Sequence, residues 1–265
     1  MLEKKSFAKV NIYLKIVGIK DGYHLLNSRF MVINSLYDTI TFKKKSEFRD
    51  EFELSGKFSC KKEDNIIHKA YKALLEVDKI SKKVEKFFKT YSVNVQKNIP
   101  EFAGLGGGSS NAATFLKMAN DAIELKLTKD ELLSLASSLG ADVAFFINEF
   151  ESANVSGIGE NVLNFDEKAL DLDIYTPPVQ CVTKDVYNAF RKELMKNYDK
   201  IISDNIKLAK KLDTLKSKEI LKDFTPTELN DLFAPAIKLY PKLQDYKNYG
   251  YFSGSGSSFF KEIKE

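Results

Sequence analysis

Apolar and polar residues alternate along residues 6–17. One face of this stretch carries Ala8, Val10, Ile12, Leu14 and Ile16, and the other carries Phe7, Lys9, Asn11, Tyr13 and Lys15. A period of two residues is that of a β-strand, so we predict a strand whose apolar face turns toward a core. A turn at Lys20-Asp21-Gly22 follows, and then strand-like segments around 28–34, 38–43 and 47–54.

Residues 64–139 change to a helical period, with apolar side chains three and four positions apart. Helices are predicted at 64–77, 109–124 and 128–139, and a strand is predicted at 91–97. Asp64 would start the first helix, whose apolar stripe is Ile66, Ile67, Ala70, Leu74 and Leu75. Thr128 and Glu131 have the spacing of a capping box, and Gly140 is typical of a helix stop.

After Ile147 the chain returns to short strands, predicted at 151–155, 161–164 and 171–176. Residues 183–223 are rich in lysine and mostly helical, with the lysines expected on solvated faces. A helix near 235–247 and a strand–turn–strand over 249–263 close the sequence. This mixture predicts an α+β protein with two domains, at residues 1–153 and 154–265.

The composition limits the possible partners. The chain has 265 residues, 43% of them apolar, and a net charge of +4, which is too small to indicate nucleic acid or a membrane surface. Cys60 and Cys181 fit no metal or redox spacing and are expected to be reduced and partly buried. The N-terminus lacks the apolar core of a signal peptide, and no apolar run reaches the roughly 18 residues of a membrane span. We therefore expect a cytoplasmic protein of the size of an enzyme.

The most informative segment, residues 100–113, reads Pro-Glu-Phe-Ala-Gly-Leu-Gly-Gly-Gly-Ser-Ser-Asn-Ala-Ala. Its glycines Gly104, Gly106, Gly107 and Gly108 let main-chain N–H groups approach a ligand closely. A helix beginning near Ser109 would add unpaired N–H groups and the positive end of its dipole. Ser109 and Ser110 could cap that helix or bind phosphate oxygens. We interpret the segment as a phosphate-binding loop.

Other interpretations of this loop fit less well. A Walker A loop ends in Gly-Lys-Ser/Thr, but Asn111 follows the serines here and no lysine is near. A dinucleotide fingerprint needs an acidic residue on a second strand, and the sequence has none at the right place. A flexible Gly/Ser linker is the remaining alternative, and the strong patterns on both sides disfavour it.

Several polar residues could carry chemistry, and each also has an ordinary structural explanation. Lys9 could stabilise charge in phosphoryl transfer beside Asn11, or both could lie on a solvated strand face. Asp142 precedes an apolar run and could be a general base or a cap. His24 lies in an Asp-Gly-Tyr-His turn, and His68 is expected to be structural. The segment Gly254-Ser255-Gly256 could close over phosphates or form a hairpin turn.

Taken in order, these segments resemble the GHMP small-molecule kinases. The matching segments are Ala8–Asn11, Asp21–His24, Asp64–Ile67, Gly104–Ala113, Gly140–Val143, Leu229–Leu232 and Ser253–Ser258. They span nearly the whole chain, and within the family they are most similar to the kinases of a cytidine-diphosphate alcohol. The resemblance implies a ribosomal-S5-like N-terminal domain and a ferredoxin-like C-terminal domain.

The resemblance also implies a reaction and roles for individual residues. The γ-phosphoryl group of ATP would pass to the C2 hydroxyl of a methylerythritol unit, with Asp142 as base and Lys9 as its electrostatic partner. The nucleotide would be held by Pro100, Ala103, Gly104, Leu105, Gly106, Gly107, Gly108, Ser109 and Ser110. The cytidylyl substrate would be held by Asn11, Tyr23, His24, Phe30, Thr183 and Tyr187, with Tyr187 stacking on the cytosine. Mg²⁺ is expected to arrive with ATP, without a dedicated protein metal site.

The sequence departs from the family pattern at three positions. Glu101 and Phe102 stand where small residues are usual, and Phe233 replaces a common acidic residue. A carboxylate close to phosphates is unfavourable, so we expect Glu101 to point away from them. Two alternatives stay open: a GHMP kinase for another small alcohol, and a GHMP-fold sensor that binds ligand without catalysis.

Overall fold

The structure is a computed structural model that describes residues 2–263, and these form two compact units. The first unit contains the described residues up to Ala8, Asn34–Ile99 and Gly107–Glu149. The second contains Lys9–Ile33, Pro100–Gly106 and the residues from Phe150 onward. The last passage from the first unit to the second lies between Glu149 and Phe150. A division into continuous domains at residues 153 and 154 stays a prediction.

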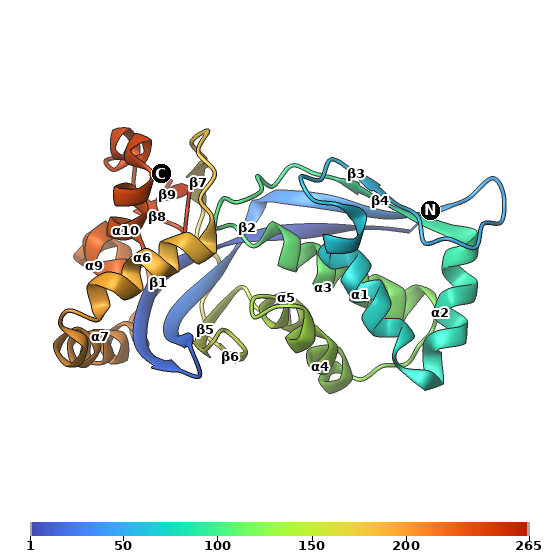
Figure 1. Ribbon diagram of the computed structural model, residues 1–265, viewed down its shortest axis with the longest axis horizontal. Helices are drawn as coiled ribbons and strands as arrows, with labels where there is room; N and C mark the ends of the chain where they lie inside the picture. The colour runs from blue at the N-terminus through green and yellow to red at the C-terminus, as the bar shows by residue number, and fades with distance from the viewer. Residues whose placement is uncertain (1, 264–265) are drawn as a thin grey trace. The chain divides into compact units, whose positions relative to one another are not determined.

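Two long strands supply residues to both units. β1 (Leu2–Lys20) pairs with β2 (Tyr23–Lys44), and both are blue in Figure 1. They join at Asp21 and Gly22, whose φ angles are +50° and +83°, so the predicted turn is confirmed. The segments predicted as strands at 28–34 and 38–43 form one continuous strand, β2.

In the first unit, helices pack on one face of β2, β3 and β4. β3 (Leu54–Gly56) runs parallel to β4 (Tyr91–Gln96), and β4 is antiparallel to β2. The helices are η1 (Lys62–Asp64), α1 (Ile66–Leu75), α2 (Asp78–Thr90), α3 (Gly107–Ala122), α4 (Lys129–Leu139) and α5 (Val143–Asn148). They gather on one side of the strands in Figure 1. Val93 and Val95 of β4 are buried while Asn94 and Gln96 are exposed, which is the pattern of a sheet covered on one face.

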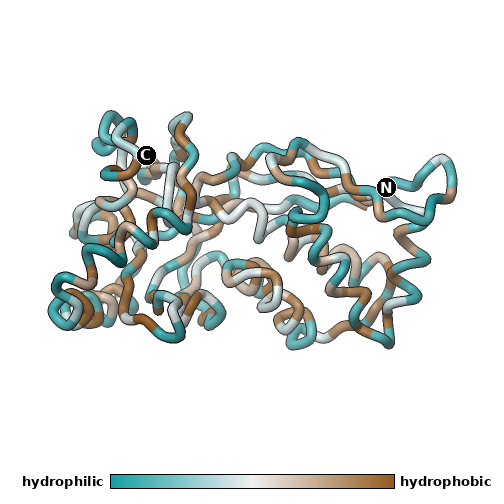
Figure 2. The backbone as a smooth tube through the Cα atoms, viewed as in Figure 1, coloured by the Kyte–Doolittle hydropathy of each residue, from teal (hydrophilic) through white to brown (hydrophobic). Residues whose placement is uncertain are grey.

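Aromatic side chains fill the core between these layers. The ring of Phe42 lies 5.4 Å from that of Phe88, and Phe88 lies 5.5 Å from Phe115. Phe52 stacks on Tyr71 at 4.1 Å. The contacts of Phe88 with Phe42 and Phe115 lie within the roughly 4.5–7 Å that is favourable for aromatic pairs. Hydrophobic and hydrophilic stretches accordingly alternate along the helices in Figure 2.

The sequence predictions for the first unit need three corrections. α1 is capped by Asn65, whose side chain accepts from the N–H of Ile67 at 2.9 Å, and Asp64 lies in the preceding 3₁₀ turn. Of residues 47–54, only Leu54 enters a strand, because β4 offers a partner only to Leu54–Gly56. α2 was not predicted. The capping box of Thr128 and Glu131 is confirmed.

The second unit contains two sheets. β5 (Ser152–Gly157) and β6 (Asn161–Asn164) continue from β2, and β7 (Leu172–Tyr175), β9 (Phe259–Glu262) and β8 (Tyr251–Phe252) form a separate antiparallel sheet. The helices are α6 (Thr183–Leu194), α7 (Tyr198–Leu212), α8 (Ser217–Asp223), α9 (Pro226–Leu229), α10 (Phe233–Leu239) and η2 (Pro241–Tyr246). The helix predicted at 235–247 is interrupted at Pro241, which lacks an N–H and cannot continue α10.

Other sequence predictions can be compared with the described residues. The lysines of 183–223 are exposed, as predicted. Cys181 is buried, but Cys60 is exposed rather than partly buried. Burial raises the pKa of the Cys181 thiol to about 11, so this side chain stays a neutral apolar group. Within residues 2–263, no helix is long and apolar enough to cross a membrane.

A buried ion pair fastens β1 to the C-terminal part of the second unit. The ammonium of Lys15 contacts the carboxylate of Asp231, and both side chains are at most 8% exposed. Asp231 also accepts from the N–H of Ile16 at 2.6 Å and from Asn205 Nδ2 at 2.7 Å. Two backbone contacts continue the link, because Leu14 bridges to Asn230 and its carbonyl accepts from the N–H of Asp231.

Replacing Asp231 should therefore destabilise the second unit strongly. We expect Asp231→Ala to lower the free energy of unfolding by about 3–5 kcal/mol, because Lys15 would stay buried without its counter-charge. The control is Glu193→Ala, which removes the exposed pairs with Lys196 and Lys238 and should cost about 1 kcal/mol or less. Urea unfolding followed by circular dichroism measures both. Equal losses in the two variants would contradict this role of the buried pair.

Candidate functional site

The polar face of β1 is buried, so the alternative of a solvated strand face is wrong. Lys9, Asn11, Tyr13 and Lys15 are 3%, 2%, 0% and 4% exposed. Buried polar groups must find partners inside the protein. Tyr13 illustrates this, because its hydroxyl lies 2.7 Å from both Asn27 Oδ1 and Asp213 Oδ1. Burial and the nearby carboxylate of Asp213 raise the pKa of Tyr13, so its hydroxyl stays neutral.

Within the second unit, oxygen atoms and an aromatic ring surround the ammonium of Lys9. Lys9 Nζ donates to Asn11 Oδ1 at 2.8 Å and to the carbonyl of Gly104 at 3.3 Å. It also lies 4.5 Å from the centroid of the Phe30 ring, a cation–π contact. Phe30, predicted to bind substrate, therefore supports Lys9 directly. The arrangement fixes a positive charge beside the glycine-rich segment.

The loop after β8 packs against the start of the glycine-rich segment. Ser253 Oγ donates to the carbonyl of Gly104 at 2.9 Å, and the N–H of Ser258 donates to the carbonyl of Ala103 at 3.1 Å. The loop joins β8 to β9, as in a hairpin, but its residues 253–258 are buried. Gly104 has a φ of +73°, and a Cβ there would lie 2.1 Å from the carbonyl oxygen of Ser253. Only glycine fits this close approach.

Thr183, predicted to hold the cytidylyl substrate, contacts the same loop. Thr183 Oγ1 lies 2.9 Å from Ser255 Oγ. Further along α6, the ring of Tyr187 lies 5.2 Å from that of His24. His24 Nε2 is a buried polar atom without a hydrogen-bond partner among the described residues. Tyr23, its neighbour, is 63% exposed. The structure thus brings Thr183, Tyr187 and His24 into one unit with Lys9 and Asn11.

The two unusual residues before the glycines lie at the surface. Glu101 is exposed, and Phe102 is 49% exposed. Phe102 has a φ of +54°, which is unfavourable for a bulky side chain. The carbonyl of Phe102 accepts from the N–H of Cys181 at 3.4 Å, so the backbone is held despite that conformation.

The later glycines and the serines belong to the first unit, where they start α3. The helix begins at Gly107, two residues before the predicted start. A Cβ on Gly107 would lie 2.8 Å from Ile99 Cγ2, whereas the space around Gly108 is open except for Ile66 at 3.7 Å. Ser110 is buried, with its hydroxyl 2.7 Å from Ser6 Oγ, so it serves the fold of this unit.

A buried network that the sequence reasoning missed fixes the chain just before this helix. Asp38 is fully buried and accepts from the N–H groups of Asn98 and Ile99 at 2.7 and 2.9 Å. It also accepts from Asn111 Nδ2 at 2.9 Å and contacts the ammonium of Lys97. The network joins the strand β2, the end of β4 and α3. Its members lie far apart in the sequence, and no local motif marks them.

Asp142 immediately precedes α5 and is half-buried. Its side chain makes no capping hydrogen bond to this helix, so the helix-cap alternative is not supported. Asp142 belongs to the first unit and Lys9 to the second, so their pairing stays a prediction. Among residues 2–263, no group of three His, Cys, Asp or Glu side chains could hold a metal ion.

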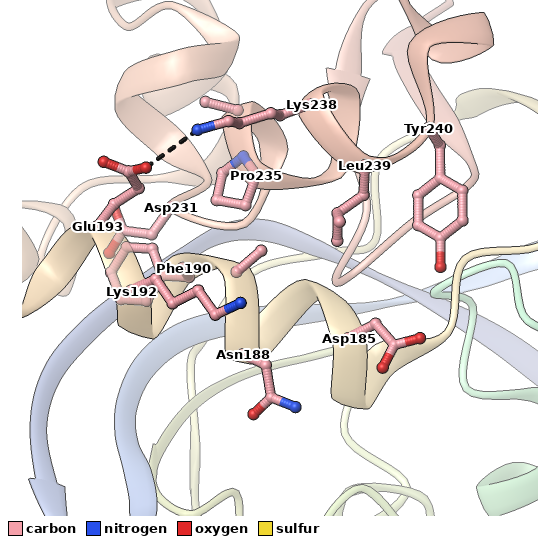
Figure 3. A pocket seen from close by; sticks show the side chains of 12 residues that line it. Asp185, Asn188, Phe190, Lys192, Glu193, Asp231, Pro235, Lys238, Leu239 and Tyr240 are labelled. Atoms are coloured by element: carbon pink, nitrogen blue, oxygen red, sulfur yellow. Dashed lines mark hydrogen bonds and ion pairs between the residues drawn. The ribbon is translucent and has the colours of Figure 1, made fainter.

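A hollow of about 1150 Å³ lies between α6 and α10 in the second unit (Figure 3). Glu193 and Lys238 form an ion pair of 3.1 Å at its edge. Tyr240 lines it and accepts from the N–H of Val182 at 3.0 Å. The lining residues of this hollow include none of the predicted site residues. Its charged groups of both signs define no particular ligand.

Comparison with known proteins first gives the class. A sequence model described as the GHMP kinases N terminal domain matches residues 65–149, which run from α1 to the end of α5. A solved structure of 4-(cytidine 5'-diphospho)-2C-methyl-D-erythritol kinase superimposes with a TM-score of 0.70 and 26% identity, covering 99% of this chain and 90% of that one. The predicted α+β GHMP kinase fold is therefore confirmed.

Curated relatives then give the family. A protein of Sulfurimonas denitrificans named 4-diphosphocytidyl-2-C-methyl-D-erythritol kinase is 50% identical over 264 residues, 98% of this chain and 96% of the relative. A protein of the same name from Campylobacter jejuni subsp. doylei is 43% identical over 260 residues, 97% of this chain and 98% of the relative. The chain belongs to the 4-diphosphocytidyl-2-C-methyl-D-erythritol kinase family.

The environment of His24 predicts a pH effect on stability. Burial and the nearby Arg191 guanidinium lower the pKa of His24 below its ordinary value of 6.5. As pH falls through 6.5, the unfolded chain therefore binds more protons at His24 than the folded chain does. The free energy of unfolding must then decrease as pH decreases. His24→Phe keeps an aromatic ring beside Tyr187 but cannot titrate. Thermal unfolding between pH 7.5 and 5.5 should show a smaller loss in the variant, and identical losses would contradict the effect.

Proposed function

We propose that this chain transfers the γ-phosphoryl group of ATP to the C2 hydroxyl of 4-diphosphocytidyl-2-C-methyl-D-erythritol, a step of the non-mevalonate route to isoprenoid precursors. The observation that carries the proposal is the 50% identity with a kinase of that name along 98% of this chain. A cytoplasmic location is part of the same proposal, since this is a step of small-molecule metabolism.

The chemistry of the described residues supports phosphoryl transfer. This reaction needs positioning and charge stabilisation more than covalent chemistry from the protein. Lys9 offers a desolvated positive charge held by Asn11 and Gly104. The first N–H groups of a helix have no partner within the helix, so the first turn of α3 favours an anion. Mg²⁺ would accompany ATP, held mainly by phosphate oxygens and water, and would neutralise charge on the transferring group.

We assign the remaining roles by family resemblance. Asp142 accepts the hydroxyl proton, and Lys9 stabilises the charge that develops. Pro100 and residues 103–110 hold the nucleotide. The cytidylyl substrate is held by Asn11, Tyr23, His24, Phe30, Thr183 and Tyr187. The paired rings of His24 and Tyr187, 5.2 Å apart, supply an aromatic surface suited to a cytosine.

The deciding experiment measures ADP release with Mg-ATP and several acceptors. We expect turnover with 4-diphosphocytidyl-2-C-methyl-D-erythritol and none with homoserine, mevalonate or galactose. Turnover with another acceptor would support a kinase activity but contradict the proposed cytidylyl-binding site. If folded protein binds nucleotide but turns over no acceptor, the sensor alternative replaces the proposal.

Removing the base should abolish transfer without unfolding the protein. Asp142→Asn keeps the size of the side chain but cannot take a proton, so kcat should fall by about 10²- to 10⁴-fold. The variant should still fold and unfold cooperatively on heating, because the Asp142 side chain makes no capping hydrogen bond to α5. Steady-state kinetics with saturating ATP measures the loss. A variant with wild-type kcat would show that Asp142 is not the base.

A further inference from the structure

Ser28, which lies outside the predicted site, is hydrogen-bonded to Asn11, and Asn11 is hydrogen-bonded to Lys9. Ser28 lies on β2 and is completely buried. Its hydroxyl accepts from Asn11 Nδ2 at 2.9 Å and donates to the carbonyl of Tyr13. Asn11 in turn accepts from Lys9 Nζ at 2.8 Å. A continuous series of hydrogen bonds thus runs from the Lys9 ammonium to the backbone of β1.

The direction of each bond fixes the orientation of the Asn11 amide. Ser28 has one hydroxyl proton, and the carbonyl of Tyr13 takes it, so the oxygen of Ser28 can only accept from Asn11. Asn11 must therefore turn Nδ2 toward Ser28 and Oδ1 toward Lys9. A reversed amide would place its N–H groups against the ammonium, where both partners are donors. Ser28 and Lys9 thus specify the same orientation from opposite ends.

Among residues 2–263, the Ser28 hydroxyl is the one hydrogen-bond partner of Asn11 Nδ2. Asn11 is 2% exposed, so bulk water does not reach its amide. On another side the amide meets the backbone of Gly254, where a Cβ would lie only 3.2 Å from Asn11 Oδ1. Without the Ser28 hydroxyl, Asn11 Nδ2 would be a buried donor without its partner. Such a group reorients to find another acceptor, and the oxygen then moves away from Lys9.

We propose that Ser28 is a positioning residue for phosphoryl transfer, acting through Asn11 on the Lys9 ammonium. This inference rests on the proposed function. Lys9 interacts with charge that grows as the phosphoryl group transfers, so misplacing it weakens the transition state more than the bound nucleotide. The expected signature is a lower kcat at nearly constant KM for ATP.

The test compares Ser28→Ala with the matched control Ser152→Ala in the full chain. Ser152 is also a completely buried strand serine of the second unit, but its hydroxyl contacts Glu167 Oε1 at 2.7 Å and is not part of the series from Lys9 through Asn11 to Ser28. Both variants should lose similar amounts of thermal stability. Only Ser28→Ala should lose about tenfold in kcat, with KM for ATP within about twofold of wild type. Ser28→Thr, which keeps the hydroxyl, should recover most of the kcat.

The outcomes separate this inference from the function itself. A wild-type kcat in Ser28→Ala would overturn the positioning role of Ser28, and so would an equal loss of kcat in Ser152→Ala. If Ser28→Ala does not fold, Ser28→Cys keeps the shape with a much weaker donor and acceptor. This variant should show a lower kcat than Ser28→Thr, and equal kcat values would overturn the inference. A wild-type chain without activity toward the cytidylyl alcohol would contradict the proposed function instead.

Discussion

The second unit depends on one constraint: the polar face of β1 is buried, so every polar group on it must have a partner inside the protein. Lys15 forms an ion pair with Asp231, and hydrogen bonds join Tyr13 to Asp213 and Asn11 to Ser28. An unpaired group at any of these places would cost about 1–3 kcal/mol, and more if it were charged. Two of the partners lie about two hundred residues further along the chain. The bonds of Tyr13 and Lys15 hold the C-terminal part against β1, and the bond between Asn11 and Ser28 on the same face helps to place Lys9.

The sequence predicts this strand well and its surroundings poorly. Alternation along residues 6–17 correctly indicates β1 and identifies its two faces. It cannot tell a polar face that meets water from one that meets buried partners, because the two have the same pattern. Local signals succeed where both partners are close in sequence, as in the capping box of Thr128 and Glu131 and the turn at Asp21-Gly22. Asp213 and Asp231 carry no such signal.

The same limit explains the other errors in the predictions. Asp38 is a strand residue in an ordinary polar stretch, and only folding brings it to the N–H groups of Asn98 and Ile99. Residues 47–54 have a strand-like pattern, but a strand exists only where a neighbour pairs with it, and the pairing with β4 begins at Leu54. Asp64 and Asn65 are both good cap residues, so the sequence could not decide between them.

The glycine-rich segment shows why its composition alone does not establish a phosphate site. Gly104 is required in the second unit because a side chain would meet the carbonyl of Ser253. Gly107 is required in the first unit because a side chain would meet Ile99. Both requirements exist before any ligand binds, so packing alone would select glycine at these two positions. Gly108 is different, because open space surrounds it and the start of α3 lies there. An anion is therefore favoured at Gly108 and the first turn of α3, because the first N–H groups of a helix have no partner within the helix.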